Sequence, residues 1–594
     1  MALRFTNSAR PSVINASSDE EVTRSLGTSA LNSKDRIIIA LDFGTTYSGV
    51  AYCFASSSDV KPIVDWLGLE GRTQPKVPTV IAYDPDDTSE FKWGGQLSWR
   101  DDHVQGVKLL LDPKQTRPPY LPSTNVKSEM KKLPKGAVDV AADFIGAMYS
   151  HALERIESRV PRGYIDLCEK TFVLSVPAVW SEKAMESTVQ AAKKAGVYPV
   201  MLIKEPEAAA LYTFKKQKRA LSVGDCFVVC DAGGGTVDLI SYEVVATKPT
   251  LDLSEVVPGT GNMSGSLGLN KRFAEAVKNL IGEEEWLSLK NTSAWAKAEQ
   301  QFDQEVKRAF AGDLDEEYIV NFPGAHLPDN EDEGLKRDFW FMPGEAVQEI
   351  FEPLISDIVR LVREQVQSAK LERPSQPVKG IFLVGGFGAS QYLKARLQDA
   401  NPDIQVIQPE DAWAAIVKGA ALSRLSHTKV VSTKATRHYG VSSMCIYEPI
   451  TDKGRPTTTS CIDGEVRTER MRWYILKGEN LRRDREERNT YVRHIPRPYT
   501  DSDLQFEDEL WVSDAAIGPT HPTAEVVCEA RDSIRAVYRL PNTIATAEVK
   551  VRGIDGRKWW KVSYDLVIST REAAMKFWLE FDGKEAGAVM ARYD

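Results

Sequence analysis

Two segments combine an aspartate with small and hydroxylated residues directly after a short apolar run. The first reads DFGTTYSG and covers residues 42–49, and the second reads DAGGGTVD and covers residues 231–238. Such residues let the backbone approach phosphate oxygens closely, and successive N–H groups form an anion-binding nest. An aspartate at the end of each run could hold Mg²⁺, usually through water. One such segment is a weak signal, but two of one design could hold a polyphosphate from opposite sides.

A third glycine-rich segment, VGGFG at residues 384–388, follows another apolar run and precedes a helical stretch at residues 391–397. Its glycines could let a flat ring or a ribose lie against the backbone. A glycine pair after a strand is more often only a turn. The segment gains weight from its position after the other two.

The elements that must position these segments are visible as apolar runs. Residues 37–41, 226–230 and 380–384 are typical of strands buried on both faces. Residues 50–54 and 239–244 follow the first two segments as return strands, so each segment is the turn of a hairpin. The repetition indicates a duplicated α/β architecture with a ligand between its halves.

Helical patterns fill the stretches between these strands. We expect helices at residues 138–158, 181–195, 270–310 and 343–370, the second capped by Ser181 and the third anchored by Trp286 and Trp295. The acidic residues 314–336 are expected to form a loop. From about residue 437, apolar and polar residues alternate as in antiparallel strands. We therefore expect a small C-terminal β module, with the mixed-charge residues 482–488 as a solvated loop.

Composition and charge exclude several classes of protein. The chain has 594 residues, 42% hydrophobic and 27% charged, with a net charge of −9. These values are typical of a globular protein and argue against nucleic acid as a partner. The seven cysteines contain no CxxC pair, which supports neither a disulfide framework nor a zinc site and favours a reducing compartment.

The sequence also shows no recognisable membrane-spanning or targeting segment. No apolar run approaches the ~18 residues of a membrane helix, so no membrane partner is expected. The first 35 residues carry no apolar core of a secretory signal, and their acidic residues argue against a transit peptide. We expect a disordered tail at residues 1–35 and a cytoplasmic protein.

Six ordered segments together resemble a known family. They read IALDFGTTYSGVAY, SVPAVWSEKAMES, IKEPEAAALYT, VVCDAGGGTVDL, FLVGGFGAS and EDAWAAIVKGAAL. This set is similar to the actin/hexokinase/heat-shock ATPase superfamily, and closely to the heat shock protein 70 kDa (DnaK-type) family, over about residues 37–425. The resemblance implies a two-lobed α/β fold with ATP or ADP and Mg²⁺ in the cleft.

The resemblance also implies a division of the chain. Residues 36–228 would form the first lobe, and residues 229–426 the second lobe with a return to the first. Residues 427–438 would be a linker, followed by the β module at residues 439–594.

The resemblance assigns roles residue by residue. Asp42 and Asp231 would hold the metal through waters, and Asp238 would orient the attacking water. Thr236 would lie by the γ-phosphate, and Glu205 near the metal–water shell. The remaining nucleotide-binding residues would be Gly44, Thr45, Thr46, Tyr47, Gly233, Gly234, Gly235, Lys307, Arg308, Gly385, Gly386, Phe387 and Asp411.

The physical argument for catalysis agrees with these roles. Phosphoryl transfer to water depends mainly on positioning and charge neutralisation, so a lysine that reaches the γ-phosphate is expected. Lys108 lies in the right region, although its neighbours differ from the family pattern. Structural alternatives stay open: Glu205 as a helix cap, and Lys307 with Arg308 as a solvated helix face.

The chain departs from the family in two places. Phe387, Gly388 and Ala389 stand where heat-shock chaperones place polar residues and an arginine that stacks on adenine. Residues 427–438 are basic and polar instead of acidic and leucine-rich, and no helical lid follows the β module. The resemblance is therefore to a divergent, lid-less branch.

Three functions follow from these observations. The first is a slow, Mg²⁺-dependent, chaperone-like ATPase whose β module binds protein clients or a co-chaperone, for example by β-augmentation. The second is a nucleotide-sensing scaffold that binds ATP or ADP without appreciable hydrolysis. The third is a sugar or metabolite kinase on the same fold. The β module could equally be a packed structural appendage.

Overall fold

The computed structural model describes most of the chain. The described residues are 35–112 except 58 and 99, 133–216, 221–425, 428–482, 486–522, 534–539, 549–569, 576–581 and 583–590. Residues 1–34 of the tail expected at residues 1–35 lie outside them, as does the first linker residue, His427.

The first large sheet has the strand order β3-β2-β1-β8-β9, and β4 also pairs with β2. Strand β1 is antiparallel to β2 and parallel to β8. It ends at Asp42, and the apolar run before this residue is buried on both faces. The strands are β1 (Arg36–Asp42), β2 (Tyr47–Phe54), β3 (Lys61–Pro62), β4 (Val77–Pro78), β8 (Glu169–Val176) and β9 (Val200–Lys204).

The second large sheet has the order β17-β16-β10-β11-β12-β18-β22. Strand β10 is antiparallel to β11 and parallel to β16, so five of its strands repeat the arrangement of the first sheet. The strands are β10 (Cys226–Ala232), β11 (Val237–Ala246), β12 (Leu251–Asn262), β16 (Val378–Val384), β17 (Gln405–Ile407), β18 (Thr428–Lys434) and β22 (Asn480–Arg482). Most of the expected linker is therefore a strand, β18, of this sheet.

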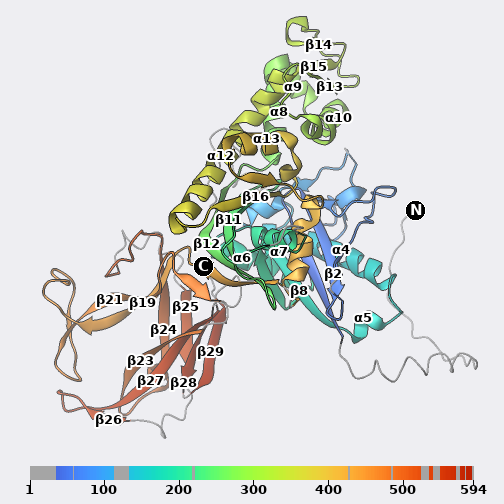
Figure 1. The fold of residues 1–594 in the computed structure, drawn as a ribbon. Helices are drawn as coiled ribbons and strands as arrows, with labels where there is room; N and C mark the ends of the chain where they lie inside the picture. Colours follow the sequence, from blue (N-terminus) through green and yellow to red (C-terminus); the bar gives the residue numbers. More distant parts are fainter. Residues whose placement is uncertain are drawn as a thin grey trace, which may run out of the picture.

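Helices α7 (Glu205–Lys216) and α14 (Ala415–Leu422) pack together between the two sheets. Their backbones approach so closely that a Cβ at Gly419 would overlap the Ala208 carbonyl. Helices α4 (Ala137–Glu157) and α6 (Glu182–Lys194) cover the other face of the first sheet, and α12 (Gly344–Glu372) covers that of the second (Figure 1). The predicted α/β class is thus confirmed.

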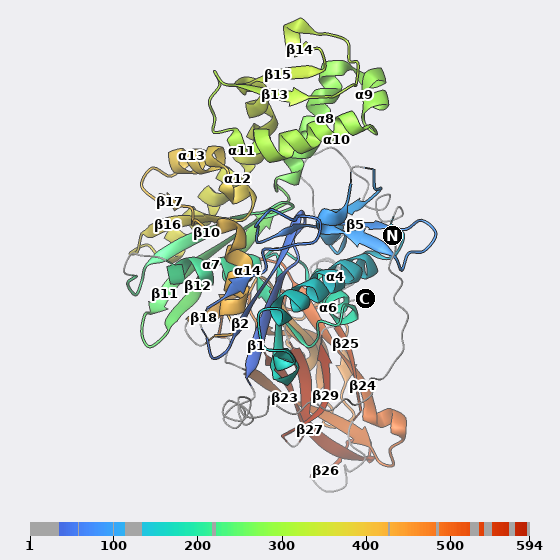
Figure 2. The ribbon, with the colours of Figure 1, turned by 90° about the vertical axis from the view of Figure 1, so that its right-hand side faces the viewer.

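A helical projection extends beyond the second sheet, at the upper end in Figure 2. It contains α8 (Leu267–Ile281), α9 (Glu283–Leu289), α10 (Ser293–Gln301), α11 (Lys307–Ala309) and a sheet of β13 (Glu317–Asn321), β14 (Leu335–Lys336) and β15 (Phe339–Pro343). Trp286 and Trp295 pack edge to face at 4.8 Å in its core, as expected. The prediction that residues 314–336 form only a loop is wrong, because β13 and β14 lie within them.

The remaining short elements lie around the two large sheets. They are β5 (Val80–Tyr83), β6 (Phe91–Trp93), β7 (Val104–Gln105), α2 (Val107–Leu110), α5 (Tyr164–Leu167) and α13 (Gln391–Ala400). The predicted helix at residues 181–195 is confirmed as α6, whose N-cap residue Ser181 accepts a hydrogen bond from Ala184 N at 3.2 Å. The helix expected at residues 343–370 is α12.

Apart from β22, the strands described after residue 437 form two antiparallel sheets, coloured orange to red in Figure 1. One sheet holds β19 (His438–Ile446), β20 (Thr458–Thr459), β21 (Val466–Ile475), β24 (Gln505–Ser513) and β25 (Ile534–Arg539). The other holds β23 (Glu486–Pro496), β26 (Val549–Arg552), β27 (Lys558–Ser569), β28 (Lys576–Phe581) and β29 (Lys584–Met590). Residues 482 and 486–488 belong to β22 and β23, so the expected loop is shorter than the stretch 482–488.

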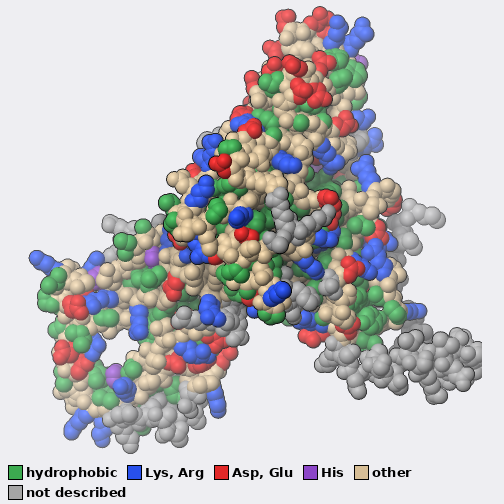
Figure 3. Space-filling model, viewed as in Figure 1, with side chains coloured by type: hydrophobic (Ala, Val, Ile, Leu, Met, Phe, Trp, Pro, Cys, Tyr) green, Lys and Arg blue, Asp and Glu red, His purple; other side chains and the backbone are tan. Residues whose placement is uncertain are grey.

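The surface carries both signs of charge. On the face in Figure 3, lysine and arginine side chains are interspersed with acidic ones, and acidic side chains gather at the upper end, over the helical projection. Within the described ranges, no helix is long and apolar enough to cross a membrane.

Candidate functional site

The turns of the two glycine-rich hairpins lie against each other. A Cβ at Gly234 would overlap the Thr46 hydroxyl, and a Cβ at Gly235 would overlap the Thr45 hydroxyl. Only glycine fits at these two positions while the threonines face it. The structure thus brings together the two segments that the sequence places almost 190 residues apart.

The second turn is fixed from behind by the chain that enters α8. The carbonyls of residues 233–235 accept hydrogen bonds from the backbone N–H groups of residues 265–267, at 2.8–3.2 Å. The N–H groups of residues 45–46 and 234–235 donate to none of the described residues. Opposed turns with available N–H groups are suited to hold an anion between them.

Asp42, at the end of β1, is fully engaged by neighbouring side chains. Lys76 Nζ lies 2.7 Å from its Oδ2, and Ser175 Oγ donates to its Oδ1 at 2.8 Å. Burial would raise the pKa of Asp42, but the charges of Lys76 and Lys108 outweigh burial and lower this pKa.

Glu205 and Lys108 form a buried ion pair beside Asp42. Glu205 is the first residue of α7, and Lys108 comes from α2, so the pair joins two distant elements. Burial raises the pKa of Glu205 to about 7, although Lys108 opposes the shift. Burial alone would lower the pKa of Lys108, but the negative charges of Glu205 and Asp42 raise it.

Asp231, the equivalent aspartate in the second hairpin, has a different environment. Its Oδ1 is buried and has no hydrogen-bond partner among the described residues. Burial, followed by the charges of Glu205 and Asp238, raises its pKa well above the usual range. A Cβ at Gly385 would overlap this same oxygen, so the third glycine-rich segment also meets the site.

Asp238 faces Asp231 across the second hairpin. Its Oδ1 accepts hydrogen bonds from the backbone N–H groups of Ala178, at 2.7 Å, and Val179, at 3.2 Å. Burial nevertheless raises its pKa. Thr236, also buried, lies two residues before it in the turn.

The charges of this cluster suit a divalent cation. Four carboxylates (Asp42, Glu205, Asp231 and Asp238) and two ammonium groups (Lys76 and Lys108) leave a formal charge of −2. The described residues hold no group of three or more possible metal ligands, so the protein alone offers no complete coordination shell. Mg²⁺ retains waters and shares phosphate oxygens, and the unpartnered Asp231 Oδ1 fits such an ion.

An aromatic pair lies beside the first turn. The rings of Tyr47 and Trp413 are 5.4 Å apart and nearly perpendicular, and a Cβ at Gly386 would stand 3.8 Å from the indole nitrogen of Trp413. Trp413 is only partly buried. Trp413 belongs to the EDAW segment, which resembles the family motif, but it was not predicted as a site residue.

Lys307 and Arg308, expected at the adenosine end, have different environments. Lys307 Nζ contacts Asp303 Oδ1 at 2.6 Å and Asn270 Oδ1 at 2.8 Å, and burial lowers its pKa. Arg308 is exposed. Burial, and next the negative charge of Asp303, raises the pKa of Tyr47. Asp303, the partner of Lys307, therefore lies near the first hairpin.

The side chains of Phe387 and Asp411 lie apart from the carboxylate cluster. Phe387 is 5% exposed and packs in the hydrophobic core, 6.4 Å from Phe351. Asp411 accepts hydrogen bonds from Tyr212 at 2.6 Å and Lys418 at 3.0 Å, and these bonds lower its pKa.

Lys76 and Ser175 are further residues that the sequence analysis missed. Neither lies in a recognisable sequence motif. Lys76, just before β4, and Ser175, in β8, each contact Asp42 from a different part of the chain. Only the pairing of β4 with β2 and of β8 with β1 reveals them.

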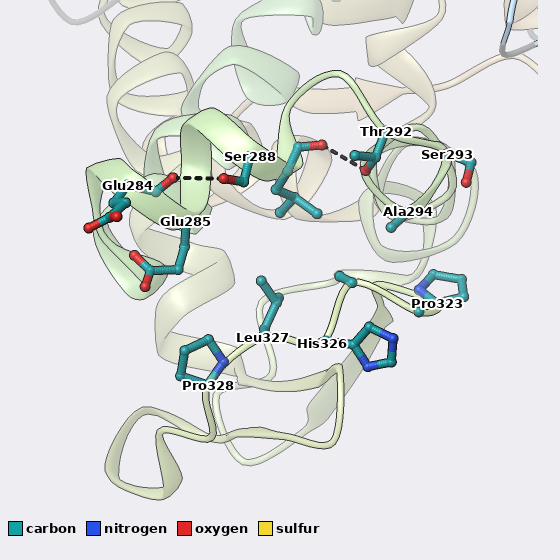
Figure 4. Close-up of a pocket in the computed structure, with 13 residues that line it drawn as sticks. Glu284, Glu285, Ser288, Thr292, Ser293, Ala294, Pro323, His326, Leu327 and Pro328 are labelled. Carbon is teal, nitrogen blue, oxygen red and sulfur yellow. Dashed lines mark hydrogen bonds between the residues drawn. The ribbon is translucent and has the colours of Figure 1, made fainter.

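A separate pocket of about 380 Å³ opens in the helical projection. Figure 4 shows Glu284, Glu285 and Ser288 of α9 on one side, with His326 and Leu327 on the other. It contains none of the predicted site residues.

Comparison with known proteins found one matching family model and several relatives. A family described as a domain of unknown function (DUF8340) matches residues 223–411. Heat shock 70 kDa protein 12A of Homo sapiens is 25% identical over 509 residues, covering 69% of this chain and 72% of that protein. Heat shock 70 kDa protein 12B of Homo sapiens is 25% identical over 548 residues, covering 75% and 78% respectively.

A bacterial relative matches a shorter region. Chaperone protein HscA of Pectobacterium carotovorum subsp. carotovorum is 30% identical over 242 residues, covering 37% of this chain and 36% of that protein. Together with the six ordered segments and the opposed glycine-rich turns, these similarities show that the chain resembles a divergent branch of the heat shock 70 kDa proteins and shares their mixed α/β architecture.

Proposed function

We propose that the chain binds ATP and ADP with Mg²⁺ between its two glycine-rich hairpins and hydrolyses ATP slowly. The observation that carries this proposal is the contact between the two turns, directly beside four buried carboxylates. Available N–H groups on both turns would hold the phosphates. Such a site needs little covalent chemistry, because phosphoryl transfer to water depends on positioning and charge.

The carboxylate cluster supports a role for Mg²⁺. Asp231 would hold the ion together with phosphate oxygens and waters, and the ion would neutralise charge that develops on the phosphates. The protein's own residues supply the orientation. The backbone N–H groups of Ala178 and Val179 fix Asp238, which would orient the attacking water.

Lys108 and Glu205 complete the proposed catalytic group. Glu205 restrains the Lys108 ammonium. Both side chains are almost fully buried: Lys108 is 4% exposed and Glu205 is 8% exposed. A phosphate that enters the site would compete with Glu205 for this ammonium. Thr236 in the second turn would contact the terminal phosphate.

Trp413 would lie at the base end of the nucleotide. Its indole lies beside Gly386 and Tyr47, and Tyr47 directly follows the first glycine-rich turn, which would hold the phosphates. The expected stacking arginine is absent from the GGFGAS segment, and Trp413 could supply a stacking surface instead.

The relatives named above include a chaperone, which supports a role with protein clients or a co-chaperone. The C-terminal sheets have edge strands, such as β20 and β29, that could accept an extended segment. Nucleotide binding in the two large sheets would then alter the behaviour of these C-terminal sheets.

A second candidate is a nucleotide sensor that hydrolyses ATP only negligibly. The buried ion pair between Lys108 and Glu205 favours it, because this ammonium is already engaged. Single-turnover phosphate release from the full chain with Mg²⁺ and ATP separates the two candidates. Release that Asp238→Asn abolishes supports the ATPase; binding without release in the unmodified chain supports the sensor, and no binding contradicts both.

A further inference from the structure

A second lysine lies inside the carboxylate cluster and has no role in the proposed reaction. Lys76 and Asp42 are paired at 2.7 Å with only 7% and 2% of their side chains exposed. Lys76 directly precedes β4, which pairs with the start of β2. A Cβ at Gly49 would stand 3.2 Å from Lys76 Cγ, so the glycine leaves room for the lysine stem.

The two hairpins differ at this point. In the second hairpin, Asp231 lies opposite Asp238, so the position across the hairpin carries a second carboxylate. In the first hairpin, Asp42 lies opposite Gly49. The stem of Lys76 passes beside this glycine, and its ammonium contacts Asp42. A fixed positive charge thus replaces a second carboxylate.

This difference decides which aspartate can serve a cation. Lys76 and Ser175 engage both oxygens of Asp42. Asp231 Oδ1, in contrast, has no partner among the residues that the structure describes. An ammonium bound to Asp42 also repels a divalent cation there, since like charges a few ångströms apart repel strongly in a buried site.

We propose that Lys76 is a built-in counter-ion for Asp42 that commits the divalent cation of a bound nucleotide to Asp231. Lys76 is a positioning residue in this account: it holds Asp42 in place and excludes a second cation. The inference rests on the proposed nucleotide site. It gives the two aspartates, which the sequence treats as a symmetric pair, different roles.

The test measures Mn²⁺ binding to the full chain with ADP, by electron paramagnetic resonance of free Mn²⁺. Four proteins are compared: the unmodified chain, Asp231→Asn, Lys76→Met and the double variant Asp42→Asn with Lys76→Met. Lys336→Met, which removes an exposed ion pair with Glu331, is the matched control. Thermal unfolding of each variant reports whether it folds.

The expected results differ in direction among the variants. Asp231→Asn weakens Mn²⁺ binding about tenfold or more, as expected for loss of a charged contact. Lys76→Met strengthens it or adds a second Mn²⁺, because Asp42 becomes free and the cluster gains a negative charge. The double variant and Lys336→Met bind Mn²⁺ within about threefold of the unmodified chain.

Two results would overturn the inference while leaving the proposed function intact. In one, the double variant loses Mn²⁺ as severely as Asp231→Asn, which would make Asp42 a partner of the cation. In the other, Lys76→Met folds and binds Mn²⁺ as the unmodified chain does, which would make Lys76 merely structural. Absence of ADP binding to the unmodified chain, with or without Mn²⁺, would overturn the proposed function and this inference together.

Discussion

At the residue scale, the site combines side chains from four separate parts of the sequence around two strand-end aspartates. Lys76 reaches the cluster from the residue before β4, and Lys108, Ser175 and Glu205 reach it from α2, β8 and α7. Burial gives these charges strong mutual effects, because the surrounding medium screens them weakly. Their protonation should therefore affect both stability and nucleotide binding.

The raised pKa of Glu205, about 7 against an ordinary value of 4.5, gives a pH-dependent prediction. Between these values the folded protein keeps a proton that the unfolded chain releases, so the Glu205 contribution to stability falls as pH rises. Replacing the pair by Glu205→Gln with Lys108→Met should remove this loss. We expect the free energy of unfolding of the double variant, relative to the unmodified chain, to rise by roughly 1–3 kcal/mol from pH 4.5 to 7.5.

Denaturant unfolding at several pH values measures this difference. The variant Lys278→Met, which removes an ion pair with Glu283 on the surface, serves as a control with no expected change over this range. A difference that stays constant or falls with pH would contradict the raised pKa of Glu205.

Trp413 gives a second prediction at this scale. Stacking of a base on an aromatic ring is worth about 1–3 kcal/mol, so Trp413→Ala should weaken ATP binding by roughly 5- to 150-fold. Trp413→Phe should retain most of the affinity. Tripolyphosphate, which has no base, should bind both variants equally in competition calorimetry. An equal loss for tripolyphosphate would mean that Trp413 supports the phosphate turns and not the base.

At the scale of elements, the two hairpins depend on glycines that the opposing turn touches. A Cβ at Gly234 would overlap Thr46, whereas a Cβ at Gly233 would meet only the Thr236 carbonyl at 3.2 Å. Gly234→Ala should push the turns apart and weaken Mg²⁺–ATP binding about tenfold or more, since overpacking costs about 1–3 kcal/mol.

Gly233→Ala is the matched variant and should weaken binding less. Calorimetric titration of both variants with ATP and Mg²⁺ makes the comparison. Equal affinities for the two variants would show that contact between the turns is unimportant for the ligand.

The elements themselves could largely be predicted from the sequence. Continuous apolar runs indicated β1, β10 and β16, and the Ser181 cap indicated the start of α6. Strands β13 and β14 were missed because they are short and lie in an acidic stretch without strong alternation. Strand β18 was taken as a linker because its polar residues hide its pairing with β12.

The site was predictable only in part, for a physical reason. Asp42, Asp231 and the glycines lie in local patterns that carry their chemistry. Lys76 and Trp413 belong to the site only through contacts with residues far away in the sequence, and no local spacing predicts those contacts. Phe387 and Asp411 were predicted from their positions in the family motifs. In the structure, Phe387 packs in the hydrophobic core and Asp411 accepts a hydrogen bond from Tyr212.

At the scale of the whole molecule, β22 joins the C-terminal part of the chain to the second large sheet. It pairs with β18, which in turn pairs with β12. The same sheet carries Asp231 on β10, so a continuous ladder runs from the carboxylate cluster to the C-terminal part. A shift of the sheet on nucleotide binding would move β22 with it.

Thr433→Pro tests this connection, because proline removes a ladder hydrogen bond and clashes in a central strand. Thr433 lies opposite Leu481 in the β18–β22 pair. We expect hydrogen exchange at residues 480–482 to increase at least about tenfold, corresponding to about 1.4 kcal/mol. Exchange in β27 should stay unchanged as an internal reference. Unchanged exchange at residues 480–482 would contradict a role of this pairing.

The central claim, a nucleotide held between the two glycine-rich hairpins, is tested most directly by calorimetric titration of the full chain with ADP and Mg²⁺. We predict one site per chain with micromolar affinity, about −8 kcal/mol. Asp231→Asn should weaken this binding about tenfold or more with Mg²⁺ present, and much less without it. No binding of ADP or ATP to the folded, unmodified chain would contradict the account.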